Sequence, residues 1–163
     1  MARVDMILIR GLPSSGKSTF AARFRGLGGC HYEADDYFRG EFGGYEFDPS
    51  KLSEAHSECQ IDAKECLMNK LDVIVANTFS QRWELEPYFL LAEKYTTKGH
   101  SLPCRDRLYV DVFVLDLFDG GLTDDELAAR NTHGVPVDVI AAMRERWEHD
   151  WRSGNPIPPW ERS

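Results

Sequence analysis

The sequence predicts an α/β protein in which a short, mostly parallel sheet lies between two layers of helices. Residues 4–9 form a nearly continuous apolar run, which is typical of a central parallel strand covered on both faces. This run passes directly into a glycine-rich segment and then into helical spacing of apolar residues. Strand and helix patterns alternate along the rest of the chain, as expected for a three-layer α/β sandwich.

The individual elements follow from periodicity and from the glycines and prolines that separate them. Phe20, Phe24 and Leu27 have helical spacing after the first strand. A segment rich in glycine later in the chain is expected to be a surface loop that could cover a site. In order, we expect strand 4–9, helix 17–27, a short strand ending at 33–34, loop 40–49, helix 50–70, strand 71–76, helix 83–98 and strand 108–117.

Two shorter helices are expected near the C-terminus. Thr123, with Glu126 three positions later, matches a capping box before a helix at 127–130. Pro136 opens a second helix that we expect to run to about residue 148. We expect these helices to form a lid at about 123–137. The tail at 151–163, with its prolines and tryptophans, either packs as an extended strap or stays mobile.

Length and charge limit the possible classes. The 163 residues fit a single domain, 1–163, and leave no room for a separate phosphatase domain. No apolar stretch approaches the roughly 20 residues of a membrane span, and no signal peptide is recognisable, so we expect a cytoplasmic protein without a membrane partner. A net charge of −8 argues against an extended surface for duplex nucleic acid. The oligomeric state is left open.

The cysteines indicate no metal or redox motif. Cys30, Cys59, Cys66 and Cys104 are far apart, and none belongs to a Cys-x-x-Cys pair. We therefore expect buried, reduced thiols.

The glycine-rich segment has the form Gly-x4-Gly-Lys-Ser, the P-loop that cradles nucleotide phosphates. Backbone amides curl around phosphate oxygens, and the following helix N-terminus adds partial positive charge. We expect Lys17 to reach the β- and γ-phosphates and Ser18 to ligate Mg²⁺. The fold expected is therefore the kinase type of P-loop NTPase with ATP and Mg²⁺ as cofactors, GTP being the open alternative. The expected nucleotide-binding residues are Gly11, Pro13, Ser14, Ser15, Gly16, Lys17, Ser18, Thr19 and Arg130.

Adjacent acids follow the second strand, at the sheet edge where α/β proteins bind ligands. A carboxylate there can accept a proton from an acceptor hydroxyl or help to hold magnesium. Paired acids in this position also serve as solvated turn residues or helix caps. Beside a P-loop, Asp35 is the predicted catalytic base and Asp36 a predicted substrate contact. Asp116 and Asp119 are alternative acids for the strand-end position that serves magnesium in GTPases and ATPases, where this chain has Asn77.

Polar residues after the third strand and in the lid complete the predicted site. Asn77 can orient a substrate but not neutralise a metal, and its alternative role is bonding backbone at the strand end. Thr78 is a second predicted substrate contact. Arg130 is expected to close on phosphates from a mobile lid, with a surface salt bridge as the alternative. His133 is a further predicted substrate contact.

Read together and in order, four segments resemble phage polynucleotide 5′-kinase domains, and the similarity spans most of residues 5–148. These segments are 11–19, 35–37, 76–78 and 130–136. The chain is also similar to the kinase-like domain of the animal Nedd-four-binding protein two group, through 35–38, 55–56 and 83–88. The resemblance implies that Lys17 and Ser18 handle ATP and magnesium, that Asp35 is the general base and that Arg130 contacts phosphate.

The chain departs from the phage pattern at residues that contact the acceptor. Phe38 stands where the phage pattern has an arginine, and Arg39, one position later, is the predicted substitute. His133 stands where the phage lid has a second basic residue, and Asn77 where the phage strand ends in an acid.

The leading hypothesis is transfer of the γ-phosphoryl group of ATP to a hydroxyl, most simply the 5′-hydroxyl of a DNA or RNA end. The first alternative changes the acceptor to a nucleoside, a modified base or another small alcohol. The second is a non-catalytic ATP-binding module that uses nucleotide only to order its lid and loop.

Overall fold

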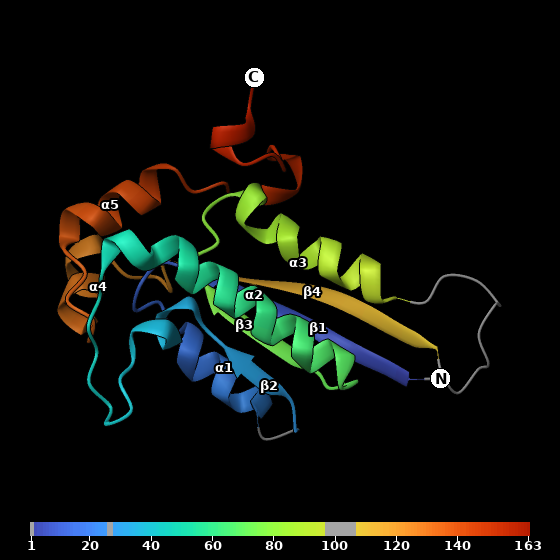
Figure 1. Cartoon of the computed structure of the whole chain (residues 1–163). Helices are drawn as coiled ribbons and strands as arrows, with labels where there is room; N and C mark the ends of the chain where they lie inside the picture. The colour runs from blue at the N-terminus through green and yellow to red at the C-terminus, as the bar shows by residue number, and fades with distance from the viewer. Residues whose placement is uncertain (1, 26–27, 97–106) are drawn as a thin grey trace.

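The computed structural model describes residues 2–25, 28–96 and 107–163, and its path is shown in Figure 1. Four strands form one sheet in the order β2-β3-β1-β4, and every neighbouring pair is parallel. The predicted α/β fold with a parallel sheet is therefore confirmed. The strands are β1 (Ala2–Gly11), β2 (Cys30–Tyr32), β3 (Val73–Asn77) and β4 (Leu108–Phe118).

Helices lie on both faces of this sheet. Helix α1 lies on one face, α2 and α3 lie on the other, and α4 and α5 lie beyond the carboxyl ends of the strands (Figure 1). The helices are α1 (Lys17–Arg25), α2 (Leu52–Met68), α3 (Arg82–Tyr95), α4 (Asp124–Arg130) and α5 (Val137–Glu145). Short 3-10 turns are η1 (Ala34–Phe38), η2 (Pro49–Lys51), η4 (Trp151–Ser153) and η5 (Pro159–Glu161).

The side chains of β1 alternate between two cores. Met6 and Leu8 are fully buried against α2 and α3, together with Val75 of the neighbouring strand. Ile9 points to the opposite face, where it packs with Ala21 of α1. Since both faces of β1 are covered at these positions, an unbroken apolar run is required there rather than an alternating one.

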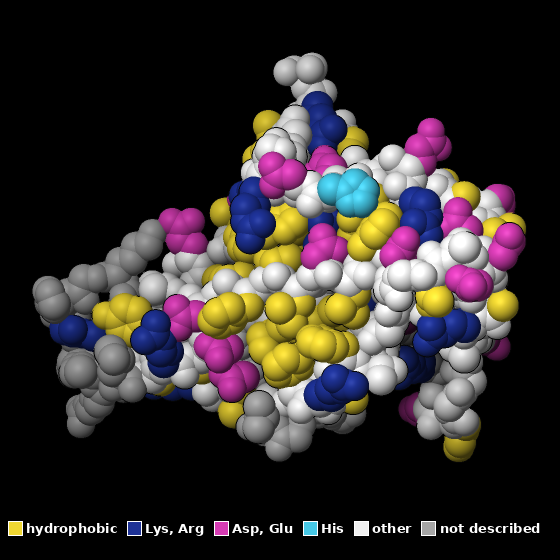
Figure 2. Space-filling model, turned by 180° about the vertical axis from the view of Figure 1, so that it is seen from behind, with side chains coloured by type: hydrophobic (Ala, Val, Ile, Leu, Met, Phe, Trp, Pro, Cys, Tyr) yellow, Lys and Arg dark blue, Asp and Glu magenta, His cyan; other side chains and the backbone are white. Residues whose placement is uncertain are grey.

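One face of the sheet is covered only in part. Helix α1 packs against β1, β2 and β3, so the outer strand β4 is left partly open on that side. Phe113 of β4 is 50% exposed, and Figure 2 shows hydrophobic side chains gathered across the middle of the molecule in the view from behind. No helix in the described parts of the chain is both long enough and apolar enough to cross a bilayer.

The boundary predicted for the second strand was wrong. The strand ends at Tyr32, and Asp35 lies in the η1 turn instead of projecting directly from a strand edge. The turn forms because Asp36 caps it: its Oδ2 accepts a hydrogen bond from the Glu33 backbone N–H at 3.0 Å. A carboxylate that closes its own turn competes with continued pairing to the sheet.

Other predicted boundaries moved by a few residues. The third strand begins at Val73, because Lys70 adopts a left-handed φ of 57° that turns the chain after α2. The helix predicted to reach 98 ends at Tyr95, and its last predicted residues lie outside the described ranges, as do 26–27 of the first helix. The last helix ends at Glu145 rather than 148.

The two C-terminal helices form as predicted and are attached to the P-loop by a small core. The capping box of α4 is present, with Thr123 and Glu126 bonding each other's backbone N–H groups. Leu127 of α4 and Ile140 of α5 are fully buried against Leu12, the first residue after β1. The helices predicted as the lid therefore share a core with the loop that they face.

Of the two arrangements open for the tail, the structure shows the strap. Trp151 stacks on Phe89 of α3 with ring centroids 5.6 Å apart. Trp160 packs edge-on against Trp83 of the same helix at 5.0 Å. The C-terminal segment therefore packs at the amino-terminal end of α3 (Figure 1).

The expectation of four reduced thiols was wrong for two of them. Cys30 of β2 and Cys66 of α2 form a disulfide, with Cα atoms 6.5 Å apart. They lie 36 residues apart in sequence, and packing of α2 on the sheet brings them together. Cys59 is free and buried as predicted, and Cys104 lies outside the described residues.

Arg10 is a fully buried cation at the carboxyl end of β1. Its guanidinium donates to the carbonyl oxygens of Phe79, Ser80 and Glu148 at 2.9 to 3.1 Å. It also pairs with the carboxylate of Asp116 at 3.1 Å. Its flat face lies 4.0 Å from the centroid of the Trp147 ring. One side chain thus joins β1 to β4, to the turn before α3 and to the segment after α5.

Replacing this guanidinium with an apolar group should destabilise the fold strongly. We predict that Arg10→Met lowers the free energy of unfolding by about 3–5 kcal/mol, because three carbonyl groups and one carboxylate lose their partner. Urea denaturation followed by circular dichroism measures this loss.

Arg3→Met is the matched control, since Arg3 also lies on β1 and pairs with an aspartate of β4, Asp111, but on the exposed surface. We expect little change there, because exposed ion pairs add little to stability. Equal losses for the two variants would contradict the role assigned to Arg10.

Candidate active site

The predicted P-loop lies between β1 and α1 and has the backbone that the motif requires. Ser14 and Gly16 have left-handed φ values of 65° and 103°. A Cβ atom at Gly11 would collide with the Ser15 hydroxyl, so a larger residue there would require the Ser15 side chain to move. These positions let the chain fold back on itself ahead of the α1 N-terminus, which faces the loop with its partial positive charge.

Lys17 lies across this loop. Its ammonium donates to the carbonyl oxygens of Gly11 and Leu12, at 2.9 Å each. Burial lowers the pKa of Lys17 to about 8, while Glu33 and Asp35 act in the opposite direction. A partly desolvated cation held by neutral carbonyl groups gains strongly from phosphate oxygens, which supply the missing negative charge.

Glu33 is a site residue that the sequence reasoning missed. Its carboxylate is buried and accepts a hydrogen bond from the Ser18 hydroxyl at 2.6 Å. The His31 Nε2 atom lies 3.1 Å from Glu33 Oε1, and the Arg39 guanidinium lies 3.6 Å from Glu33 Oε2. Burial opposes its ionisation, but hydrogen bonds from His31 and Ser18 outweigh burial and lower the pKa of Glu33. The signal in the sequence is an acid directly after the second strand, next to the pair Asp35 and Asp36.

The oxygen donors at this point fit magnesium. Ser18 and Glu33 offer a hydroxyl and a carboxylate, the ligand types that Mg²⁺ prefers, next to the loop that would hold phosphates. Within residues 2–25, 28–96 and 107–163, no group of three or more His, Cys, Asp or Glu side chains could hold a metal alone.

Asp35 is placed by a contact from the neighbouring strand. Asn77, at the end of β3, is buried, and its Oδ1 accepts the backbone N–H of Ala34 at 2.8 Å. This is the backbone role considered as the alternative for Asn77, although the residue also lines the cavity. Asp35 lines the same cavity as the P-loop, and its Oδ1 accepts a hydrogen bond from the Tyr45 hydroxyl at 3.2 Å.

The lid segment between α4 and α5 is ordered by its own side chain. Asn131 Oδ1 accepts the backbone N–H groups of His133 and Val135, at 2.8 and 3.1 Å. The His133 ring packs against Tyr45 with centroids 4.1 Å apart. Its Nδ1 is buried, and in the described part of the chain it has no hydrogen-bond partner. Such an atom marks a place where a ligand group can bind.

One cavity of about 480 Å³ joins these elements. It is enclosed by the P-loop, the η1 turn, the carboxyl end of β3, the amino ends of α2 and α3, and the lid. Most of the predicted site residues line it, namely Pro13, Ser14, Gly16, Lys17, Ser18, Thr19, Asp35, Asn77, Thr78, Arg130 and His133. The remaining lining residues include Glu33, Tyr45, Phe47, Leu52, His56, Glu84, Val139 and Arg146.

Some predicted residues have other contacts. Asp36 caps the η1 turn, and Arg39 pairs with it at 3.4 Å outside the cavity. Gly11 and Ser15 shape the loop without lining the cavity. Of the alternative acids, Asp116 pairs with Arg10 and Asp119 with Arg144, so both serve structure.

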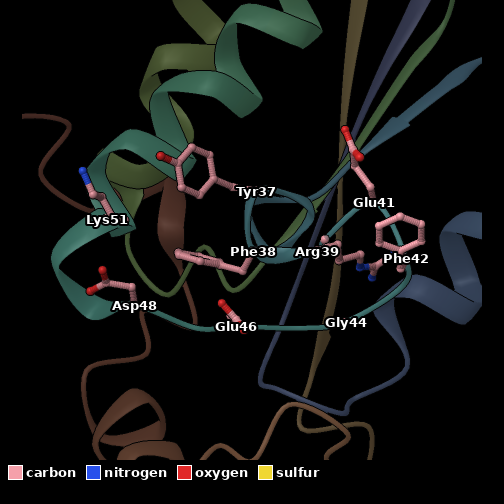
Figure 3. A pocket seen from close by; sticks show the side chains of 10 residues that line it. Tyr37, Phe38, Arg39, Glu41, Phe42, Gly44, Glu46, Asp48 and Lys51 are labelled. Atoms are coloured by element: carbon pink, nitrogen blue, oxygen red, sulfur yellow. The ribbon is translucent and has the colours of Figure 1, made fainter.

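Phe38 anchors the loop that covers this site. The ring is buried and packs against Phe47 at 5.1 Å and Tyr45 at 6.2 Å. Figure 3 shows Phe38 inside the curve of the loop, while Phe42 lies out at its tip. Phe38, which stands where the phage pattern has an arginine, is thus part of a small aromatic core that holds the loop.

Comparison with known proteins agrees with this geometry. The family model AAA_33, described as an AAA domain, matches residues 6–149. NEDD4-binding protein 2 of Homo sapiens is 36% identical over 146 residues, which cover 88% of this chain and 8% of that protein. This chain therefore corresponds to a small part of that relative.

Solved structures share the fold. A chain of the Pnkp1/Rnl/Hen1 RNA repair complex superposes with a TM-score of 0.63 at 20% identity, covering 90% of this chain and 44% of that one. A second structure of the Pnkp1/Rnl/Hen1 complex superposes with a TM-score of 0.53 at 23% identity, covering 80% of this chain and 40% of that one. With the family match over most of the chain, these results show that the protein belongs to the AAA_33 family of P-loop kinase-like domains.

Proposed function

We propose that this chain is an ATP-dependent kinase that transfers the γ-phosphoryl group to the 5′-hydroxyl of a nucleic-acid end. The observation that carries the proposal is the shared cavity, which is lined by Asp35, by the P-loop and by the lid residue Arg130. A carboxylate opposite a phosphate loop can receive the proton of an attacking hydroxyl. An ATP-binding module without catalysis has no need of such a group.

The proposed reaction gives a role to each group that lines the cavity. The P-loop amides and Lys17 would hold the β- and γ-phosphates. Ser18 and Glu33 would hold Mg²⁺, which would neutralise phosphate charge. The acceptor oxygen attacks the γ-phosphorus as its proton passes to Asp35, and the bond to the β–γ bridging oxygen breaks to release ADP. Arg130 closes on the transferring group from the lid and stabilises its charge.

The aromatic and apolar lining of the cavity favours an acceptor with an aromatic base. Tyr45, Phe47, Leu52 and His56 all line the cavity, and the Tyr45 hydroxyl contacts Asp35. Burial lowers the pKa of His56, which favours the neutral ring. Aromatic and apolar side chains suit the flat face of a nucleobase, whereas a polyol needs a paired donor or acceptor for each hydroxyl. The aromatic wall equally suits a free nucleoside, which is the second candidate acceptor.

Acceptor choice can be measured directly. We expect radiolabel from [γ-³²P]ATP to appear on 5′-hydroxyl DNA or RNA oligonucleotides, because their terminal base and hydroxyl fit the cavity together. A panel containing nucleosides and small polyols, scored by ADP release, distinguishes the second candidate. Bound ATP without transfer to any of these acceptors would contradict the kinase proposal.

The two adjacent acids should differ sharply when each is made neutral. We predict that Asp35→Asn lowers the turnover number by at least about 100-fold, since an amide cannot take the acceptor proton. ATP affinity, measured by calorimetry, should stay close to that of the natural protein.

Asp36→Asn is the matched control, because its amide oxygen can still accept the Glu33 N–H that caps the turn. Activity should be retained there. A large loss of activity in Asp36→Asn with little loss in Asp35→Asn would show that Asp35 is not the base.

Lys17 should make ATP binding depend on pH. Its pKa of about 8 in the free protein means that it is largely neutral at pH 9, and phosphates favour the charged form. We therefore expect ATP affinity to fall as pH rises above 8, by up to about tenfold per unit, with uptake of close to one proton on binding at pH 9. Calorimetry in buffers of different ionisation enthalpy counts this proton.

Lys17→Met provides the control for this titration. Its weaker ATP binding should show no proton uptake at pH 9. Uptake that persists in this variant would assign the titration to another group.

A further inference from the structure

Tyr45 connects three parts of the molecule that are distant in sequence. It lies in the return arm of the loop at 40–49, where it forms an antiparallel bridge with Arg39. Its hydroxyl donates to Asp35 Oδ1 at 3.2 Å. Its ring meets the edge of the His133 ring in the lid, at 4.1 Å between centroids. One side chain thus contacts both the predicted base and the lid.

The loop is held so that Tyr45 keeps this position. The Phe38 ring packs against the rings of Tyr45 and Phe47, with centroids 6.2 and 5.1 Å away. Figure 3 shows Phe38 inside the loop. The Glu46 backbone N–H donates to the Phe38 carbonyl at 3.0 Å. Because Phe38 belongs to the same turn as Asp35, the loop and the carboxylate are held to one another.

The hydroxyl of Tyr45 is suited to act as a permanent donor. Burial and the nearby charge of Asp35 raise the pKa of Tyr45, so its proton stays in place through neutral and alkaline pH. The hydrogen bond uses one carboxylate oxygen of Asp35. Its other oxygen, Oδ2, makes no hydrogen bond within the described residues and is left for the acceptor hydroxyl.

We propose that Tyr45 is a positioning residue for phosphoryl transfer, which orients the Asp35 carboxylate through its hydroxyl and links that orientation to lid closure through its ring. This inference rests on the proposed kinase function. The hydroxyl fixes which oxygen of Asp35 meets the acceptor. The ring supports His133, so that the lid reaches its closed position only when the loop is in place over the base.

The test compares three tyrosine variants with the natural protein in the oligonucleotide kinase assay. Tyr45→Phe removes only the hydroxyl, and we expect about a tenfold lower turnover number with unchanged KM for ATP. Tyr45→Ala also removes the ring from His133, and should raise the KM for ATP as well, since the lid then closes poorly.

Tyr37→Phe is the matched control. Tyr37 lies two residues after Asp35 and donates to the exposed carboxylate of Glu54 at 2.7 Å. It loses the same type of hydrogen bond away from the cavity, so its kinetics should equal those of the natural protein. Thermal unfolding of all variants, followed by circular dichroism, identifies any loss that comes from the fold alone.

A double-mutant cycle shows whether Tyr45 acts through Asp35. In single-turnover measurements, Tyr45→Phe should cause no further loss in the Asp35→Asn background, because no carboxylate remains to be oriented. Independent, multiplicative losses would overturn the proposal. A Tyr45→Phe effect confined to the KM of the acceptor would also overturn it, since the tyrosine would then be a substrate contact.

Failure of the proposed function gives a different result. In that case the natural protein transfers phosphate to no acceptor, although it binds ATP, and the inference falls with it. If the natural protein is active and Tyr45→Phe keeps its full turnover number, the kinase function stands and the role of Tyr45 alone is rejected.

Discussion

The arrangement of this molecule depends on one buried cation, Arg10, at the point where the central strand becomes the phosphate loop. A guanidinium removed from water needs hydrogen-bond partners, and here its N–H groups make four hydrogen bonds, to three backbone carbonyls and to the carboxylate of Asp116. These partners come from the turn before α3, from β4 and from the segment after α5. Since the next residue is Gly11, the same contacts determine where the P-loop begins relative to the rest of the protein.

Parallel pairing then brings the reacting groups to one edge. Arg10 stands opposite Asn77 in the β1–β3 ladder, so the amide of Asn77 lies beside the start of the loop. That amide holds the backbone of Ala34, and the following residue is Asp35. On the other side, Glu33 meets Ser18. These groups lie at or just beyond the carboxyl ends of the strands, so a short sheet can place the phosphate loop, the proposed magnesium ligands and the proposed base around a single cavity.

The parts of this structure that were predictable are those encoded by neighbouring residues. The strand at 4–9, the loop motif at 11–18 and the capping box at Thr123 are local patterns, and each was found where expected. The rest depends on distant partners. In the sequence, Arg10 is only a charged residue after an apolar run, and its partners lie 69 to 138 residues further along the chain. The Cys30–Cys66 bridge and the Tyr45–Asp35 contact likewise exist only once α2 and the loop have packed, so spacing alone carries no signal of them.

The central claim is that the P-loop and Asp35 act on one acceptor hydroxyl within a single cavity. A crystal structure with Mg²⁺, a non-hydrolysable ATP analogue and a 5′-hydroxyl dinucleotide tests it most directly. The account predicts the γ-phosphate between Lys17 and Arg130, and the 5′-oxygen about 2.6–3.2 Å from an oxygen of Asp35 and in line with the bridging oxygen that leaves. An acceptor bound away from Asp35, with its hydroxyl out of line with the γ-phosphorus, would contradict the account.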